Sequence, residues 1–119
     1  MNEAALKQRT KYFAKLIINL CRSLPNNREG CLIGDQLFRS GTSVAANYRA
    51  ACRGRSKAEF ISKLSIVVEE ADEAQFWLEL LKEMNITNDL SVNELLKEAN
   101  ELVSIFVSSI KTTKRNLKS

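Results

Sequence analysis

Apolar residues between Lys57 and Met84 recur at spacings that alternate strictly between four and three. The members of this seam are Phe60, Leu64, Val67, Ala71, Ala74, Leu78 and Leu81. Such spacing puts them all on one side of an α-helix, because a helix has about 3.6 residues per turn. Seams of this kind occur where long helices pack side by side at about 20°. The chain is therefore expected to pack at least one long helix along others of similar length.

Three further stretches carry a helical apolar period, so we expect helices at about residues 3–24, 29–53, 57–84 and 92–114. One proline and four glycines in 119 residues leave few positions for tight turns, which argues against a many-stranded barrel or sandwich. Long helices joined by short loops are the elements of a helical bundle. The sequence thus predicts an all-α fold in one domain, residues 1–119, as an antiparallel up-down-up-down four-helix bundle.

Polar signals mark where these helices begin and end. Pro25–Asn27 is expected to end the first helix and Gly54 the second. Ser56–Glu59 and Ser91–Glu94 both have the S-x-x-E form of a capping box, in which the side chains satisfy free N–H groups of a first turn. We therefore expect new helices at these two serines. The basic tail 111–119 is expected to fray.

The chain contains no histidine, which removes whole classes of chemistry. Ser-His-Asp and Cys-His catalysis and the H-E-x-x-H metalloproteases all need an imidazole as base or ligand. Glu69, Glu70 and Glu73 are close together on one expected helix, but di-metal bundles use an E-x-x-H motif. We therefore expect a non-enzymatic protein with no metal and no cofactor, which stoichiometric iron or manganese in the purified protein would contradict.

The cysteine pattern and the hydropathy bear on location. Cys21, Cys31 and Cys52 are odd in number and have no C-x-x-C spacing, so we expect reduced, partly buried thiols. No apolar run approaches the roughly 18 residues of a membrane span, and the first ten residues lack the apolar region of a signal peptide. A cytoplasmic protein without a membrane partner is the expectation.

Charge is unevenly distributed along the chain. Up to Arg55 there are ten basic and three acidic residues, whereas the remainder has eight basic and eleven acidic residues. The first part therefore carries a formal charge of +7 and the second −3. This asymmetry indicates either an anionic partner for the basic part, or complementary faces that meet inside the fold or between subunits.

A second apolar face lies beside the seam of the third expected helix. Ile66, Trp77, Leu80 and Met84 cluster about 100° to 160° away from the seam. Either this helix is wide-faced and sits between two neighbours, or the second face is a subunit interface. We favour the interface, because a small monomer rarely exposes such a patch and because Trp and Met are enriched at interface cores.

Two carboxylates, Glu70 and Glu73, lie on the same second face and need partners. On the preceding helix Arg49 and Arg53 are i,i+4 neighbours, and Arg39 lies within about 80° of their line. An intersubunit Arg–Glu set is therefore one prediction, so the expected interface residues are Ile66, Glu70, Glu73, Trp77, Leu80 and Met84. A solvated charged surface is the alternative.

The same basic residues also support nucleic-acid binding. The candidate contacts are Arg39, Arg49, Arg53, Arg55 and Lys57. They gather on one expected helix and the turn after it, where they could contact phosphates while the nearby Tyr48 stacks on a base. Tyr48 also lies on the apparent core stripe, and no sequence-level nucleic-acid motif is present.

Several strings of the sequence resemble one known family. They are R-S-G-T-S-V-A-A-N-Y-R at Arg39–Arg49, R-S-K-A-E-F at Arg55–Phe60, E-E-A-D-E-A-Q-F-W-L-E-L-L at Glu69–Leu81 and S-S-I-K-T-T-K-R-N at Ser108–Asn116. Together they resemble the 23S ribosomal RNA intervening-sequence proteins over nearly the whole chain. Ala50 departs from the glutamate that the family often has after N-Y-R, so no ion pair is carried over to that position.

The resemblance implies an antiparallel four-helix bundle that assembles as a homopentamer. It implies no settled activity, because the family takes its name from reading frames inside insertions in bacterial ribosomal RNA genes. Related proteins are accessory subunits of diversity-generating retroelements, where a basic pentamer engages reverse transcriptase and nucleic acid. We therefore expect a non-enzymatic pentameric scaffold, basic and cytoplasmic, that associates with structured RNA or a ribonucleoprotein.

The alternative expectation is a protein-protein interaction adaptor with no direct nucleic-acid binding. In that case the arginines act within the pentamer as Arg–Glu pairs. Charge reversal at Arg49 would then break the oligomer, whereas in an RNA-binding scaffold it would spare the oligomer and weaken RNA binding.

Overall fold

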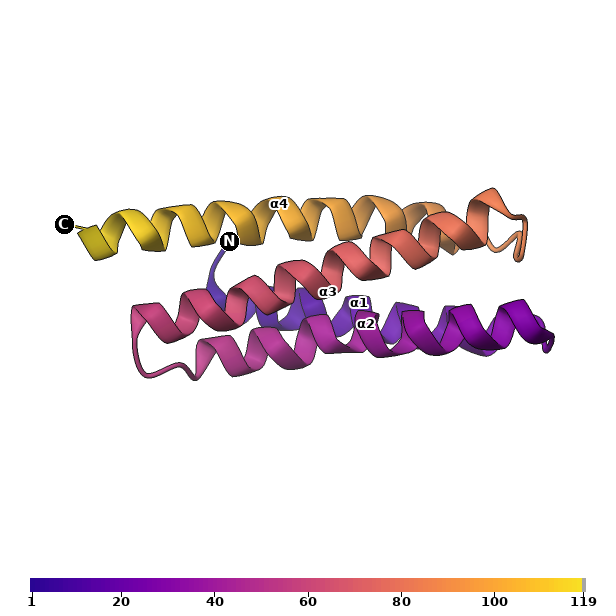
Figure 1. Cartoon of the computed structure of the whole chain (residues 1–119), viewed down its shortest axis with the longest axis horizontal. Helices are drawn as coiled ribbons and strands as arrows, with labels where there is room; N and C mark the ends of the chain where they lie inside the picture. Colours follow the sequence, from indigo (N-terminus) through magenta and orange to yellow (C-terminus); the bar gives the residue numbers. More distant parts are fainter. Residues whose placement is uncertain (119) are drawn as a thin grey trace.

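Four α-helices account for most of residues 1–118, the part of the chain that the computed structural model describes (Figure 1). They are α1 (Glu3–Ser23), α2 (Arg28–Cys52), α3 (Lys57–Glu83) and α4 (Ser91–Lys118). No strand occurs within the described residues. The all-α four-helix expectation is therefore confirmed, and the molecule is an elongated body of 52 × 21 × 20 Å.

Polar side chains cap the first three helices. The Asn2 and Asn27 side chains each accept a hydrogen bond of 2.8 Å, from the backbone N–H of Ala5 and of Gly30 respectively. Ser56 Oγ accepts the N–H of Glu59 at 3.1 Å, as the capping-box spacing predicts. Each cap satisfies one of the N–H groups that a helix start leaves without a partner.

The start of α4 differs from the prediction. Ser91 does not cap the helix but is its first residue, and the Asp89 carboxylate accepts the backbone N–H of Ser91 at 2.9 Å. That hydrogen bond lowers the pKa of Asp89, because it favours the charged carboxylate. The S-x-x-E pattern therefore marked the right region, but an aspartate two residues earlier supplies the cap.

The expected fraying of the basic tail is wrong for residues 111–118, because α4 continues to Lys118 instead of ending near residue 114. Ile110 still packs against the core, and half-buried Thr113 donates a hydrogen bond of 2.8 Å to the carbonyl oxygen of Ser109. Further along α4, Asn116 lines a hollow together with residues of the α2–α3 turn. Ser119 lies outside the described residues.

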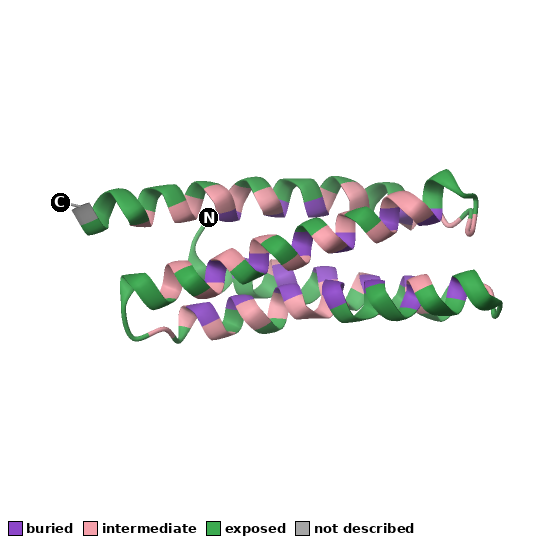
Figure 2. Cartoon of the chain, in the orientation of Figure 1, coloured by how far each residue is buried: buried purple, intermediate pink, exposed green. Residues whose placement is uncertain are grey.

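The predicted seam of α3 is the centre of the core. Its members from Leu64 to Leu81 are fully buried, and only Phe60 at the start is half-buried. The buried residues form periodic bands along the helices (Figure 2). The small residue Gly41 brings α2 close to α1, since a Cβ at this position would lie 2.8 Å from two carbon atoms of Ile17. One hydrophobic cluster joins all four helices.

The helices are arranged so that α2 packs on α1 and α3, α3 packs on α4, and a smaller contact joins α1 to α4. Within residues 1–118, α1 does not pack on α3. The α1–α2 and α3–α4 connections lie at one end of the body and the α2–α3 connection at the other (Figure 1). Within the described residues, α1 and α3 therefore lie diagonally opposite each other, as do α2 and α4.

An arginine cluster strengthens the smaller contact between α1 and α4. Arg9 donates two hydrogen bonds of 2.7 Å to the two carboxylate oxygens of Glu98, and a third of 2.7 Å to Glu101. These carboxylates raise the pKa of Arg9, the Glu98 hydrogen bond most of all. Such a two-pronged pair fixes both distance and orientation between the helices. Sequence analysis did not single out this cluster.

None of the helices described in residues 1–118 has both the length and the apolar character that a membrane crossing requires.

Candidate nucleic-acid interface

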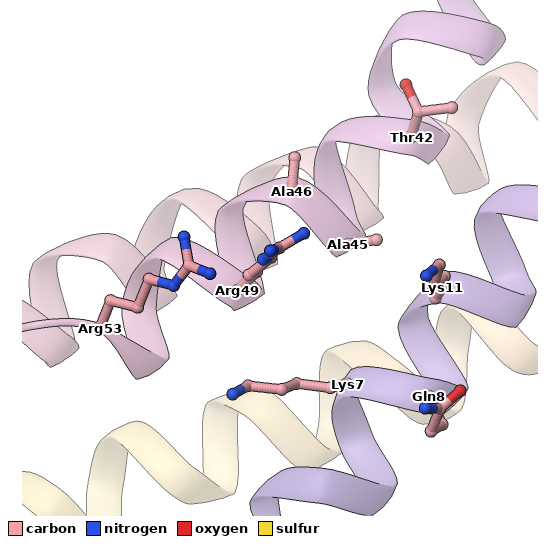
Figure 3. Close-up of a pocket in the computed structure, with 8 residues that line it drawn as sticks. All are labelled: Lys7, Gln8, Lys11, Thr42, Ala45, Ala46, Arg49 and Arg53. Atoms are coloured by element: carbon pink, nitrogen blue, oxygen red, sulfur yellow. The ribbon is translucent and has the colours of Figure 1, made fainter.

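A groove of about 550 Å³ runs between α1 and α2 (Figure 3). Its lining consists of Lys7, Gln8 and Lys11 from α1 and of Thr42, Ala45, Ala46, Arg49 and Arg53 from α2. The α2 side begins with three small residues and ends with two long arginines. The short side chains leave space between the helices, and the long cationic ones border that space.

Four positive charges surround this groove, and none of its lining residues is acidic. Lys7 and Lys11 are one turn apart on α1, as are Arg49 and Arg53 at the end of α2. All four are exposed. Like charges held this close repel one another, so an anion bound between them is favoured.

These four cations make few ion pairs with carboxylates of the described residues. Lys7 Nζ lies 3.3 Å from a carboxylate oxygen of Glu3, in an exposed i,i+4 pair of the kind that contributes little energy. Lys11, Arg49 and Arg53 make no ion pair with any residue in the described part of the chain. Three of the four charges are thus available to a ligand.

The five basic residues predicted as nucleic-acid contacts fall into three places. Arg49 and Arg53 share the groove. Arg55 and Lys57 line a separate hollow of about 520 Å³ at the α2–α3 turn, beside the C-terminal part of α4. Arg39 lies elsewhere on α2, against two carboxylates of α3. The structure therefore brings together two of the five in one groove and separates the rest.

Arg39 links α2 to α3 through the carboxylates of the second face. Its guanidinium donates a hydrogen bond of 2.9 Å to Glu70 and another to Glu73. Glu73 also accepts the indole N–H of Trp77 at 3.0 Å. The Trp77 hydrogen bond, followed by the contact with Arg39, lowers the pKa of Glu73. The Arg–Glu set is formed here within one chain, whereas the sequence suggested a partner subunit.

The suggested base-stacking role of Tyr48 is wrong. Only 4% of this residue is exposed, and its ring packs on Phe106 with 5.3 Å between ring centroids. Burial also raises the pKa of the Tyr48 hydroxyl, because it penalises the charged form. The core-stripe interpretation of this residue is the correct one.

Lys7 and Lys11 are the groove residues that sequence analysis missed. Their i,i+4 spacing on the polar side of the first helix was visible in the sequence. The sequence alone does not show which side of α1 faces the arginines of α2. That information depends on how α1 and α2 pack, including the close approach at Gly41.

The predicted interface residues on α3 form a partly exposed face. Ile66 and Met84 are 38% and 67% exposed, whereas Leu80 is half-buried. Trp77 is also half-buried and packs against the core. Phe76, which the prediction did not include, is exposed beside it, with its ring centroid 5.0 Å from that of Trp77. The face thus combines core packing at Trp77 with apolar side chains left open to solvent.

The three cysteines differ in exposure, and Cys31 is the exposed one. Cys21, Cys31 and Cys52 are all free. Burial, and secondarily the charge of Asp35, raises the pKa of Cys21 to about 11, which keeps it as the weakly nucleophilic thiol. In residues 1–118, no group of three or more Cys, Asp or Glu side chains is arranged to hold a metal ion.

The chain is thus a small four-helix protein with a cationic groove on one flank. The sequence profile of the 23S rRNA-intervening sequence protein family matches residues 2–108, and the chain belongs to this family. It is also similar to a crystal structure of a protein with unknown function from the S23 ribosomal protein family of Bacteroides thetaiotaomicron VPI-5482. The two chains are 34% identical, with a TM-score of 0.85 over 93% of this chain and 99% of the other. No protein of curated function matches the sequence.

Proposed function

We propose that this protein is a non-enzymatic scaffold of the cytoplasm that binds structured RNA, free or in a ribonucleoprotein, in the groove between α1 and α2. One observation carries the proposal: four cationic side chains border the groove and no carboxylate lines it. Two other arginines of the chain, Arg9 and Arg39, are paired with carboxylates. A surface that leaves arginines without carboxylates is suited to a polyanion.

The chemistry of the groove fits phosphate groups. Arg49 and Arg53 present planar guanidinium groups, which match phosphate oxygens with two parallel hydrogen bonds. Lys7 and Lys11 add compact charges from the opposite side. Contacts of this kind hold a nucleic-acid backbone in position and do not by themselves select a sequence. The groove therefore supports binding by charge and shape.

For the assembly, we propose an antiparallel up-down-up-down bundle that forms a homopentamer through the second face of α3. Ile66 and Phe76 are exposed on this helix and Met84 at its C-cap, and exposed apolar side chains favour burial against another surface. The groove lies on the α1–α2 flank, and α1 does not pack on α3 in the described residues. In a closed ring of five, this face of α3 would pack against a different face of the next subunit.

The salt dependence of RNA affinity tests the binding proposal. Four phosphate contacts predict that the logarithm of the association constant falls with the logarithm of salt concentration with a slope of roughly −3 to −4. The measurement is fluorescence anisotropy of a labelled RNA hairpin over a salt series. A flat dependence, or no binding at low salt, would sink the proposal.

Sedimentation velocity tests the assembly separately. Ile66→Asp puts a charge on the proposed interface and should shift the pentamer toward smaller species. Leu90→Asp is the matched control, because Leu90 is 81% exposed and lies outside α3. An Ile66→Asp protein that sediments as the wild type does would reject the α3 interface without touching the RNA proposal.

The adaptor remains the second candidate, and one observation favours it. Arg39 is already bound to carboxylates inside the chain, as an arginine with a structural role would be. If the intact oligomer binds no RNA at any salt concentration, the adaptor replaces the scaffold as the better proposal. The other arginines would then pair with carboxylates of neighbouring subunits, as Arg39 pairs with Glu70 and Glu73 within its own chain.

A further inference from the structure

The outer faces of α1 and α3 carry opposite charge. Glu3 in the first turn is the only acidic residue of α1, whereas the exposed side of α3 carries Glu69 and Asp72. We infer that α3 of one copy packs along α1 of a second copy, and that Lys15 lies between Glu69 and Asp72 of its neighbour. This contact extends the proposed function, on whose α3 interface it rests, and it names the face that receives α3.

Lys15 is at the centre of the outer face of α1. It lies two residues from each of the buried Phe13 and Ile17, which is about 160° around the helix axis. Lys11 and Arg22 are exposed on the same face, within about 40° of Lys15. None of these three cations makes an ion pair with a carboxylate of the described residues. The outer face of α1 is thus a row of positive charges without carboxylate partners.

The outer face of α3 has the opposite character. Glu69 lies about 160° around the axis from each of the buried Val67 and Ala71. Phe76 is 51% exposed and lies within about 20° of Glu69 on the same face. Glu69 and Asp72 make no ion pair with any residue in the described part of the chain. Like charges three residues apart repel one another, so a cation between them is favoured.

This protein twice places a cation between two acidic residues spaced three apart on a neighbouring helix. Glu98 and Glu101 hold Arg9, and Glu70 and Glu73 hold Arg39. Glu69 and Asp72 repeat the spacing, but no cation of residues 1–118 completes the set. Within one chain α1 is diagonally opposite α3, so its cations can reach this pair only from a second copy.

The heights of residues along the bundle select Lys15 as the missing cation. The helices α1 and α3 run in the same direction, because the α1–α2 and α3–α4 connections lie at one end of the body (Figure 1). Glu3 lines one hollow together with Lys57 and Phe60, so both helices begin at about the same height. Both rise equally per residue, so residues at one height differ by about 54 to 57 in number. Lys15 is therefore level with residues 69–72.

A ring brings these levels against each other. Copies related by rotation about an axis parallel to the bundle keep their heights, so α1 of one copy meets α3 of the next in register. By the same difference in number, Lys11 is level with Ile66 and Arg22 with Phe76. The apolar stems of long cationic side chains can cover such exposed apolar groups while their charges stay in water. The two faces therefore match in charge and in apolar content.

Carbodiimide cross-linking tests the contact directly. The reagent joins a lysine amine to a carboxylate as an amide, with loss of one water, where the two side chains meet. Because α1 does not pack on α3 in residues 1–118, an amide between Lys15 and Glu69 or Asp72 can only join two copies. We expect mass spectrometry to find this link in the covalent dimer of the wild-type protein. A covalent dimer whose links all join other positions would overturn the contact.

Charge reversal tests the contact by sedimentation velocity. Lys15→Glu should weaken assembly at least about 100-fold, because three like charges would then meet across the interface. The triple variant Lys15→Glu/Glu69→Lys/Asp72→Lys restores opposite charges and should assemble within about tenfold of the wild type. Lys82→Glu is the matched control, because Lys82 is exposed but lies about 140° from Glu69 around α3. It should assemble within about twofold of the wild type.

Two results would separate the failures. If the wild type assembles and Lys15→Glu assembles equally well, or the folded triple variant stays dissociated, the α1 contact is wrong and the proposed α3 interface stands. If the wild type sediments as a monomer, the proposed assembly fails and the α1 contact fails with it. RNA binding in the groove is a separate question, because Lys15 does not line it. Circular dichroism of Lys15→Glu should match the wild type, as expected for a substitution at an exposed position.

Discussion

The middle of α2 and its C-terminal end use the same side chain in opposite ways. Arg39 lies opposite Glu70 and Glu73 of α3 and binds both. Arg49 and Arg53 lie beside a flank of α1 that offers lysines, and they bind no carboxylate of the described residues. Nothing in the arginines themselves distinguishes these roles. The neighbouring helix decides whether an arginine joins two helices or remains available to a ligand.

Arg9 shows that the same rule holds on the other side of the bundle. It binds Glu98 and Glu101, a second pair of glutamates spaced three residues apart on the opposite helix. An E-x-x-E pair across from an arginine therefore marks a helix–helix contact twice in this chain. A cationic flank across from arginines marks the candidate binding site.

The double variant Arg49→Glu/Arg53→Glu should weaken hairpin RNA binding about 100-fold, because each lost charge-assisted contact contributes about 1.5 kcal/mol. It should also make the salt slope shallower by about 2, since two phosphate contacts disappear. Anisotropy at several salt concentrations measures both quantities. Arg39→Gln is the matched control on the same helix and should change the affinity less than about threefold. Equal losses in the two proteins would break the division between the middle and the C-terminal end of α2.

Arg9→Met should lower the free energy of unfolding by about 1–2 kcal/mol, because it leaves the half-buried Glu98 carboxylate without its partner. Urea denaturation measures the change. Lys7→Met is the control, since its pair with Glu3 is exposed on both sides and should contribute less than about 0.5 kcal/mol. If the two variants unfold at the same urea concentration, Arg9 is not a structural contact of the kind described here.

Arg39→Met should have a smaller effect on stability, at most about 1 kcal/mol, because the arginine side chain is 48% exposed and water screens its ion pairs. The same substitution should leave RNA affinity nearly unchanged. Urea denaturation and anisotropy on one preparation check both statements. A large loss of RNA affinity with little loss of stability would mean that Arg39 contacts RNA and does not mainly hold α2 against α3.

Much of this architecture could be predicted from the sequence because it depends on local patterns. The alternating spacing from Phe60 to Leu81 fixed the buried side of α3, and Ser56 fixed its start. Periodicity and capping are properties of one helix, so they need no knowledge of its neighbours. The end of α4 was missed because Asn116, beyond the regular stripe, lines a hollow with residues of the α2–α3 turn, which are distant in the sequence.

The candidate site could be predicted only in part, because it depends on which flanks face each other. Sequence patterns selected Arg49 and Arg53 but grouped them with Arg39, which binds α3 instead. They missed Lys7 and Lys11, whose position beside the arginines follows from the packing of α1 on α2. A charge on a helix surface has no partner until the neighbouring helix is in place.

Acid should reveal the contact at Arg39 through its carboxylate partner. The pKa of Glu73 in the folded chain is below its ordinary value, so the unfolded chain binds the proton more readily. The stabilisation is therefore complete above the ordinary pKa of glutamate, about 4.3, and is lost as the pH falls through the lower folded value. Urea midpoints measured from pH 7 to pH 3 should thus fall less steeply for Glu73→Gln than for the wild type.

Trp77→Phe should also reduce the acid sensitivity, because it removes the indole N–H that favours the charged carboxylate and keeps an aromatic ring in place. Identical acid profiles for all three proteins would mean that Glu73 contributes no pH-dependent stability, and the E-x-x-E rule would then rest on Arg9 alone.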